Sequence, residues 1–146
     1  MDKRLAPTWW SLKIALGAGP FLAGLDKFFN LLTNWTDYLN PVALQYVPVD
    51  AVTFMRCVGI VEMIVGLMIL TLWTKIGAYV AAGWLVAIAI SLVAMGKYYD
   101  IAVRDVLLAV SAFTLARLSA LRQGEYVHSD ARPYKHSPQE ILTLRL

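Results

Sequence analysis

Four long apolar runs constrain this chain more than any other feature of its sequence. They cover residues 9–32, 52–73, 76–95 and 101–121. Each is about 20 residues long, and a helix of that length spans roughly 30 Å, the thickness of the hydrocarbon core of a bilayer. A backbone inside lipid must satisfy its own hydrogen bonds, so we expect every run to be an α-helix. The sequence therefore predicts an all-α integral membrane protein with four transmembrane helices.

The composition fits a membrane protein better than a soluble one. Of the 146 residues, 59% are hydrophobic and 16% are charged, whereas soluble domains carry about 25% charged residues. A soluble domain this short has too little interior to hide so much apolar surface. The net charge of +3 does not indicate nucleic-acid binding, because the cations lie at the ends of the apolar runs and in a polar tail.

Short connections and loop charges predict the topology. The second, third and fourth runs are joined by links of a few residues, so we expect an antiparallel up-down-up-down bundle. Loop 33–51 contains no lysine or arginine, whereas both are frequent near the two termini. By the positive-inside rule both termini are therefore expected in the cytoplasm. Small residues should let the helices approach closely, among them Gly17, Gly24, Gly59 and Gly66.

Two features are expected at the membrane surface. Asn40 is a good N-cap residue, Pro41 suits the first helical position and Pro48 would end a helix, so the first loop should contain a short interfacial helix. Trp and Tyr side chains at the ends of the runs, such as Trp9 and Trp10, are expected at the level of the lipid headgroups.

After the four-helix domain of residues 1–122, the sequence predicts a polar tail over residues 123–146. Residues 137–140 read Ser-Pro-Gln-Glu, which is the spacing of a capping box with proline at the first helical position. A short helix is therefore expected over residues 138–146. Because so short a helix is marginal in water, it should dock on the membrane, on the bundle or on a partner.

Ionisable residues inside a membrane are costly, so each one is a functional hypothesis. Glu62 lies about 15 Å along its helix and so close to the bilayer midplane. As a functional group it would relay protons or bind a quinone-like headgroup. As a structural group it would clamp helices by bonding a backbone carbonyl or Arg104. The other candidate site residues are Asp26, Lys27, Arg56, Arg104 and Asp105.

Antiparallel packing brings these other candidates to the outer end of the bundle. Two interpretations remain open. In one they form an ion-pair cluster, with Arg104 reaching Asp100 one turn earlier, or with aspartates pairing across helices to Arg56 or Arg104. In the other they form a polar vestibule that receives a substrate or docks a partner.

The residue types that are missing exclude several classes of site. Cys57 is the only cysteine, so no disulfide within the chain and no cysteine-based metal site is expected. His128 and His136 both lie in the tail, which leaves no membrane histidine to ligate haem. There is no phosphate loop, no Ser–His–Asp set and no metal-spaced carboxylate pair. We therefore expect no metal, and no cofactor held by this chain alone.

Three short motifs resemble the DoxX family of small bacterial and archaeal membrane proteins. Residues 24–28 (GLDKF) resemble the family signature at the end of the first helix, and residues 62–67 (EMIVGL) resemble its E-x-x-x-G-L signature in the second. Residues 100–105 (DIAVRD) look like the start of its fourth helix. The resemblance covers nearly all of residues 9–121.

The resemblance implies an inner-membrane subunit of an electron-transfer complex such as thiosulfate:quinone oxidoreductase. In this interpretation the chain is not catalytic alone, its partners are lipids and other membrane subunits, and a quinone is contacted near Glu62. Motif matching marks Lys27, Glu62, Arg104 and Asp105. Two alternatives remain open: a purely structural accessory subunit of a respiratory or photosynthetic complex, and a lipid-handling protein or small-solute permease.

Overall fold

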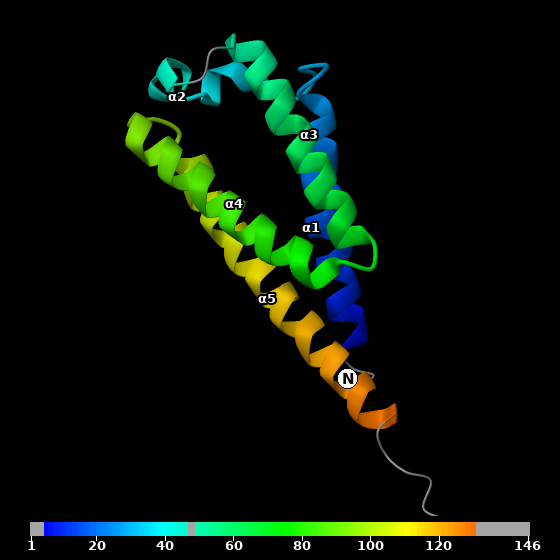
Figure 1. The fold of residues 1–146 in the computed structure, drawn as a ribbon. Coiled ribbons are helices and arrows are strands. Elements are labelled where there is room, and N and C mark those ends of the chain that lie inside the picture. The colour runs from blue at the N-terminus through cyan, green and yellow to red at the C-terminus, as the bar shows by residue number, and fades with distance from the viewer. Residues whose placement is uncertain (1–4, 47–48, 131–146) are drawn as a thin grey trace, which may run out of the picture.

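The computed structural model describes residues 5–46 and 49–130, which form an all-helical fold without strands (Figure 1). Of residues 123–130 it describes the backbone. Four long helices and two short ones follow one another along the chain. In order they are α1 (Ala6–Asp26), the 3₁₀ helix η1 (Trp35–Tyr38), α2 (Pro41–Tyr46), α3 (Ala51–Leu70), α4 (Thr74–Met95) and α5 (Tyr99–Asp130).

Helix α1 ends six residues earlier than the apolar pattern predicts. Its last residue, Asp26, turns its carboxylate back on the chain and accepts the backbone N–H groups of Leu31 and Leu32 at 3.0 and 3.1 Å. Asn30 adopts the left-handed region with φ 52°, which a helix cannot continue. A carboxylate near a helix end competes for backbone donors, so this side chain ends the helix although the residues after it are apolar.

Helix α5 is longer than the expected run of residues 101–121. It starts at Tyr99 and continues to Asp130, so the first part of the expected polar tail is helical. Its 32 residues correspond to roughly 48 Å, more than the roughly 30 Å of a hydrocarbon core. In Figure 1 its C-terminal end extends past the other helices. Charged residues propagate a helix well, and no proline follows until Pro133. The expected helix over residues 138–146 lies outside the described residues.

The short helix expected in the first loop is confirmed as α2. The Oδ1 atom of Asn40 accepts the backbone N–H of Val42 at 3.0 Å, and Pro41 is the first helical residue. The preceding 3₁₀ helix, η1, is not visible in the hydrophobic pattern because it is only four residues long.

The four long helices form two antiparallel pairs. Helix α1 packs most extensively on α3, and α4 on α5, while the contacts between the pairs are smaller. Figure 1 shows that the pairs meet where α3 turns into α4 and diverge toward the opposite end, where α2 lies. We call these the narrow end and the wide end. The chain direction alternates along the bundle, as the short links predict.

Glycines set the close approach of α1 and α3, as expected. A Cβ atom added to Gly59 would lie 2.6 Å from the carbonyl oxygen of Gly24, and one added to Gly66 would lie 2.6 Å from the carbonyl oxygen of Gly17. Because these obstacles are backbone atoms, any larger residue would push the two helices apart.

The main apolar core lies at the narrow end, where all four long helices meet. Ile69 of α3, Ala78 of α4 and Leu115 of α5 are fully buried there. Trp9 belongs to this core: its Nε1 donates to Ser119 Oγ at 2.8 Å. The Trp9 ring is thus buried among the helices, whereas Trp10 is half exposed. An indole that faces neighbouring helices finds its acceptor inside the protein.

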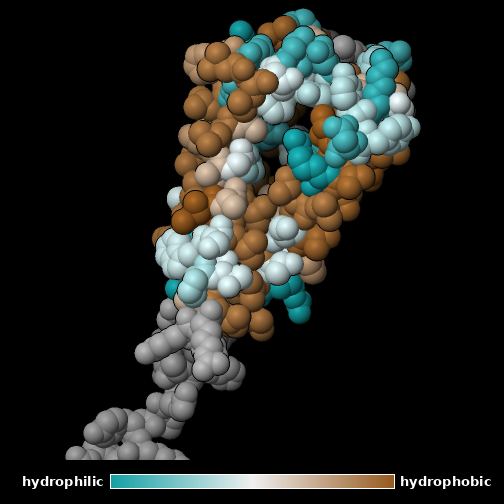
Figure 2. All heavy atoms as spheres, turned by 180° about the vertical axis from the view of Figure 1, so that it is seen from behind, coloured by the Kyte–Doolittle hydropathy of each residue, from teal (hydrophilic) through white to brown (hydrophobic). Residues whose placement is uncertain are grey.

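Two of the helices, α3 and α4, are long and apolar enough to cross a membrane by length and composition. Helices α1 and α5, as far as they are described, are not among them. Nevertheless, large apolar side chains are exposed on all four long helices, for example Leu22, Ile64, Ile90 and Leu107. Figure 2 shows the resulting hydrophobic surface over much of one face.

Candidate functional site

A cavity of about 590 Å³ lies between the two diverging helix pairs. All four long helices and the first loop contribute to its walls. Figure 2 shows a hollow in the upper part of the protein, with both polar and apolar side chains around it. Gly19 and Pro20 of α1 face the cavity, and a Cβ atom on Gly19 would meet no atom within 4 Å. Most of the wall is apolar, including Phe54, Val58, Leu85, Ile88 and Leu108.

Glu62 pairs with Lys27 at this cavity. Lys27 Nζ donates to Glu62 Oε2 at 2.6 Å, and the two side chains are 4% and 11% exposed. The packing explains the pair: Gly59 lies one turn before Glu62 on α3, and a Cβ atom on it would meet Lys27 Cβ at 3.1 Å. The expected partners of Glu62, Arg104 or a backbone carbonyl, are not the ones it uses.

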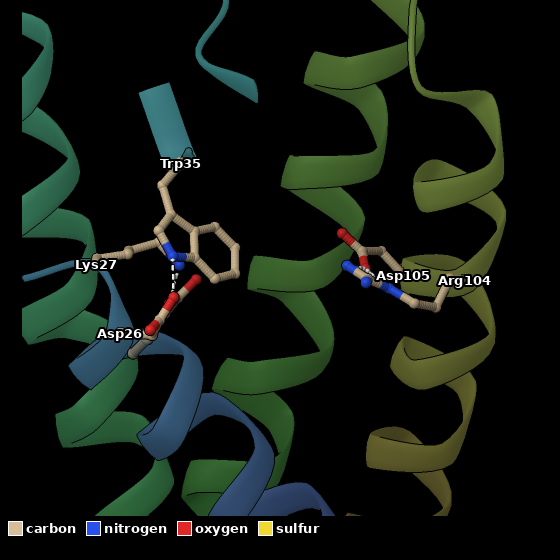
Figure 3. Close-up of polar contacts among 6 residues, drawn as sticks. Asp26, Lys27, Trp35, Arg104 and Asp105 are labelled. Atoms are coloured by element: carbon tan, nitrogen blue, oxygen red, sulfur yellow. Dashed lines mark hydrogen bonds and ion pairs between the residues drawn. The ribbon is translucent and has the colours of Figure 1, made fainter. Parts of the chain in front are cut away.

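Asp26 positions the loop over this ion pair. Besides the two backbone N–H groups, its carboxylate accepts Trp35 Nε1 at 2.8 Å. The Trp35 ring is thereby held over Lys27, with Nζ 3.7 Å from the ring centroid (Figure 3). A desolvated cation–π contact of this kind is worth about 2 kcal/mol. Asp26 therefore does not pair with Arg56 or Arg104, the partners considered from the sequence.

Arg104 and Asp105 project from α5 on the opposite side of the cavity (Figure 3). Arg104 donates from Nε and Nη2 to Asp105 Oδ1 at 3.1 and 3.0 Å. The Asp105 side chain is only 4% exposed, whereas that of Arg104 is 61% exposed. The expected pair of Arg104 with Asp100 is not formed, because the guanidinium turns to the neighbouring carboxylate instead.

Arg56 is the candidate that the structure leaves out. Its side chain is exposed, it does not line the cavity, and within the described part of the chain it forms no ion pair. The structure thus brings four candidates to the cavity wall and places Asp26 just behind it. The four are Lys27, Glu62, Arg104 and Asp105.

Two tryptophans of the site were not among the sequence candidates. Trp35 covers Lys27, and Trp84 of α4 lines the cavity beside Glu62. The Trp84 Nε1 atom is buried, lies next to the Glu62 carboxylate, and has no hydrogen bond of acceptable geometry within the described residues. A buried indole N–H usually has a partner. A tryptophan in the middle of the apolar run 76–95 therefore indicates from the sequence alone that a polar partner lies nearby.

The chemistry of the cavity is that of a site for an amphipathic molecule. Lys27, Trp84 and Arg104 offer donors, Glu62 and Asp105 offer acceptors, and the remaining wall is apolar. Among the described residues no group of three or more His, Cys, Asp or Glu side chains could hold a metal ion.

The fold and the site together define an all-helical protein with a mostly apolar cavity that carries charged side chains on two facing sides. Comparison of the chain with protein families, with curated proteins and with solved structures found no match.

Proposed function

We propose that this protein is a four-span inner-membrane subunit of a bacterial or archaeal electron-transfer complex, in which the cavity holds a quinone headgroup. The observation that carries the proposal is the cavity itself: apolar walls around a buried Lys27–Glu62 pair. A quinone needs a donor for each carbonyl oxygen and an apolar surface for its ring and tail. Lys27 next to α1, Trp84 of α4 and Arg104 of α5 provide such donors.

Membrane insertion of all four long helices is supported by where their charges point. Within the apolar runs of α1 and α5, Lys13, Asp26 and Asp105 are 7%, 7% and 3% exposed. They face the protein interior, as polar groups of membrane helices do. Leucine, isoleucine and valine occupy most of the outer faces, although Arg104 and Arg117 of α5 are exposed. Soluble monomers rarely expose so much contiguous apolar surface. With both termini in the cytoplasm, the cavity lies in the outer half of the bilayer.

The resemblance to DoxX proteins supports the same proposal, because the residues it marks are the ones that line the cavity. Lys27, Glu62, Arg104 and Asp105 come from three motifs far apart in the chain. In this proposal the chain binds and orients the quinone, and partner subunits hold the redox centres. Its own catalytic contribution would be limited to proton exchange at Glu62.

The test is a quinone titration of the purified protein in detergent. A short-chain ubiquinone and a short-chain menaquinone are added separately while tryptophan fluorescence is recorded, because Trp35 and Trp84 line the cavity. We expect saturable quenching by at least one of them. Glu62→Gln should weaken it at least tenfold, while Asp100→Asn, an exposed carboxylate outside the cavity, should not.

Quenching that never saturates, or that is unchanged in Glu62→Gln, would refute the quinone site. The rival functions predict other outcomes. A purely structural accessory subunit would bind no quinone, and deletion of residues 137–146 would release it from its complex. A lipid-handling protein or permease would move lipid or solute in reconstituted vesicles.

A further inference from the structure

Two cations share one aromatic side chain at the narrow end, far from the cavity. Lys13 of α1 places Nζ 4.9 Å from the centroid of the Trp9 ring, and Arg122 of α5 places Cζ 4.3 Å from it. Lys13 Nζ also lies 5.3 Å from the ring of Trp10. Because both cations lie within 5 Å of the same ring centroid, the two charges are close enough to repel each other.

Neither cation has an anionic partner within the described part of the chain. Lys13 Nζ donates to the backbone carbonyl of Thr71 at 2.9 Å, which is a dipole and not a charge. Arg122 Nη1 is buried and has no hydrogen-bond partner among the described residues. The carboxylates whose side chains are described lie in the loops, in the wide half or near the middle of the bundle: Asp26, Asp37, Asp50, Glu62, Asp100 and Asp105.

Two adjacent cations with little solvent are unfavourable unless an anion joins them. Arg122 is partly exposed as a residue, although its Nη1 is buried, so an anion at the surface can approach its side chain. Lys13 is only 7% exposed and adds positive potential from its position 4.9 Å from the Trp9 centroid. Guanidinium and ammonium groups together are a good site for a phosphate, because each hydrogen bond is charge-assisted.

The surroundings favour a phosphate that belongs to a lipid. Leu72, Trp73 and Leu121 lie next in sequence to Thr71 and Arg122, and they are 92%, 62% and 68% exposed. Exposed leucines and tryptophans beside cations are typical of the boundary between acyl chains and headgroups. A free phosphate ion would gain nothing from these apolar neighbours.

We propose that Lys13 and Arg122 form a binding site for a phosphate-bearing anion, supplied by an acidic phospholipid of the cytoplasmic leaflet. The inference rests on the membrane insertion within the proposed function, but it is independent of the quinone. A failed quinone titration therefore leaves it intact, whereas a protein that does not insert at all would bind neither lipid tested below.

The experiment is native mass spectrometry of the full chain in detergent, titrated with phosphatidylglycerol, with phosphatidylcholine of the same acyl chains, and with inorganic phosphate. We expect the first bound lipid to be phosphatidylglycerol, with millimolar inorganic phosphate unable to displace it. Each cation beside an anionic lipid contributes about fivefold to binding. Arg122→Gln should therefore weaken phosphatidylglycerol binding about fivefold, and the double variant Lys13→Gln/Arg122→Gln about thirtyfold.

Matched variants separate this site from general surface charge. Arg117→Gln removes an exposed arginine of the same helix and should change binding less than twofold. Arg122→Lys keeps the charge and should retain most of the phosphatidylglycerol binding. If the double variant fails to fold, the comparison of Arg122→Lys with Arg122→Gln still tests the role of this charge. Glu125→Gln removes the carboxyl group that follows Arg122 by three residues in the sequence. A preference for phosphatidylglycerol that appears only in Glu125→Gln would mean that Glu125 already supplies the anion for Arg122, and this result would overturn the proposal. Equal binding of both lipids, or displacement of the lipid by inorganic phosphate, would overturn it as well.

Discussion

Breaking one side of the Lys27–Glu62 pair should destabilise the protein far more than replacing both residues. At the observed separation of 2.6 Å and an effective dielectric constant of about 20, the attraction amounts to about 6 kcal/mol. Burial of the two ions offsets it, because each loses several kcal/mol of hydration. The net contribution of the pair to stability is therefore close to zero.

A single replacement leaves the other ion buried alone. We expect Lys27→Met and Glu62→Met each to lower the free energy of unfolding by about 3–5 kcal/mol. In the double variant neither charge remains, so its stability should lie within about 1 kcal/mol of the natural protein. Lys27→Met should cost more than Glu62→Met, because it also removes the cation–π contact with Trp35.

The assay is equilibrium unfolding in mild detergent by titration with sodium dodecyl sulfate, followed by tryptophan fluorescence. Lys97→Met, at an exposed lysine, is the control and should leave the midpoint unchanged. Two results would refute the reasoning, because each would show that the ions are hydrated. One is a loss of unfolding free energy below about 1 kcal/mol in the single variants, and the other is a loss in the double variant that equals the sum of the two single losses.

Three further perturbations test packing, a buried hydrogen bond and a helix cap. Gly59→Ala should destabilise the protein by about 1–3 kcal/mol, because its Cβ would meet the Gly24 carbonyl oxygen. The control Gly83→Ala, whose Cβ would meet no atom within 4 Å, should be neutral or stabilising. Equal melting temperatures of the two variants would contradict this prediction. Trp9→Phe and Ser119→Ala should each cost about 1–2 kcal/mol, and an additive double variant would show that the 2.8 Å bond contributes nothing. Hydrogen bonds from Thr53 hold the pKa of Asp50 below its ordinary value of 3.8, so the stability from this cap is present above pH 3.8 and is lost as the pH falls through the lower pKa of the folded protein. Asp50→Asn keeps a capping oxygen that does not titrate, so it should flatten this acid limb in thermal unfolding, and an unchanged limb would contradict the assignment.

Much of the helical architecture is predictable because it depends on local signals. Long apolar runs, the Asn40-Pro41 start and the short links all act within a few residues, and the structure has helices where they predict them. The errors occur at helix ends. Asp26 ends α1 by bonding the chain that follows it, and α5 continues because nothing stops it. A hydrophobicity profile shows neither the early end of α1 nor the extension of α5.

The site is predictable in its residue types but not in its pairings. The charged residues in the apolar runs include Lys27, Glu62, Arg104 and Asp105, which the structure brings to one cavity. Hydropathy cannot show that Glu62 meets Lys27, which lies 35 residues away, or that Arg56 faces outward. Those outcomes depend on how each helix is rotated about its axis.

The sequence by itself determined that this protein is helical, where its long helices run and which charges they carry, because helix formation and hydrophobic length are local properties. Only the tertiary structure decided how the helices lie against one another. The glycine contacts between α1 and α3 bring Lys27 to Glu62, while the divergence of α4 and α5 from that pair opens the cavity. Close packing depends on the shapes of distant side chains together, so no single segment contains it.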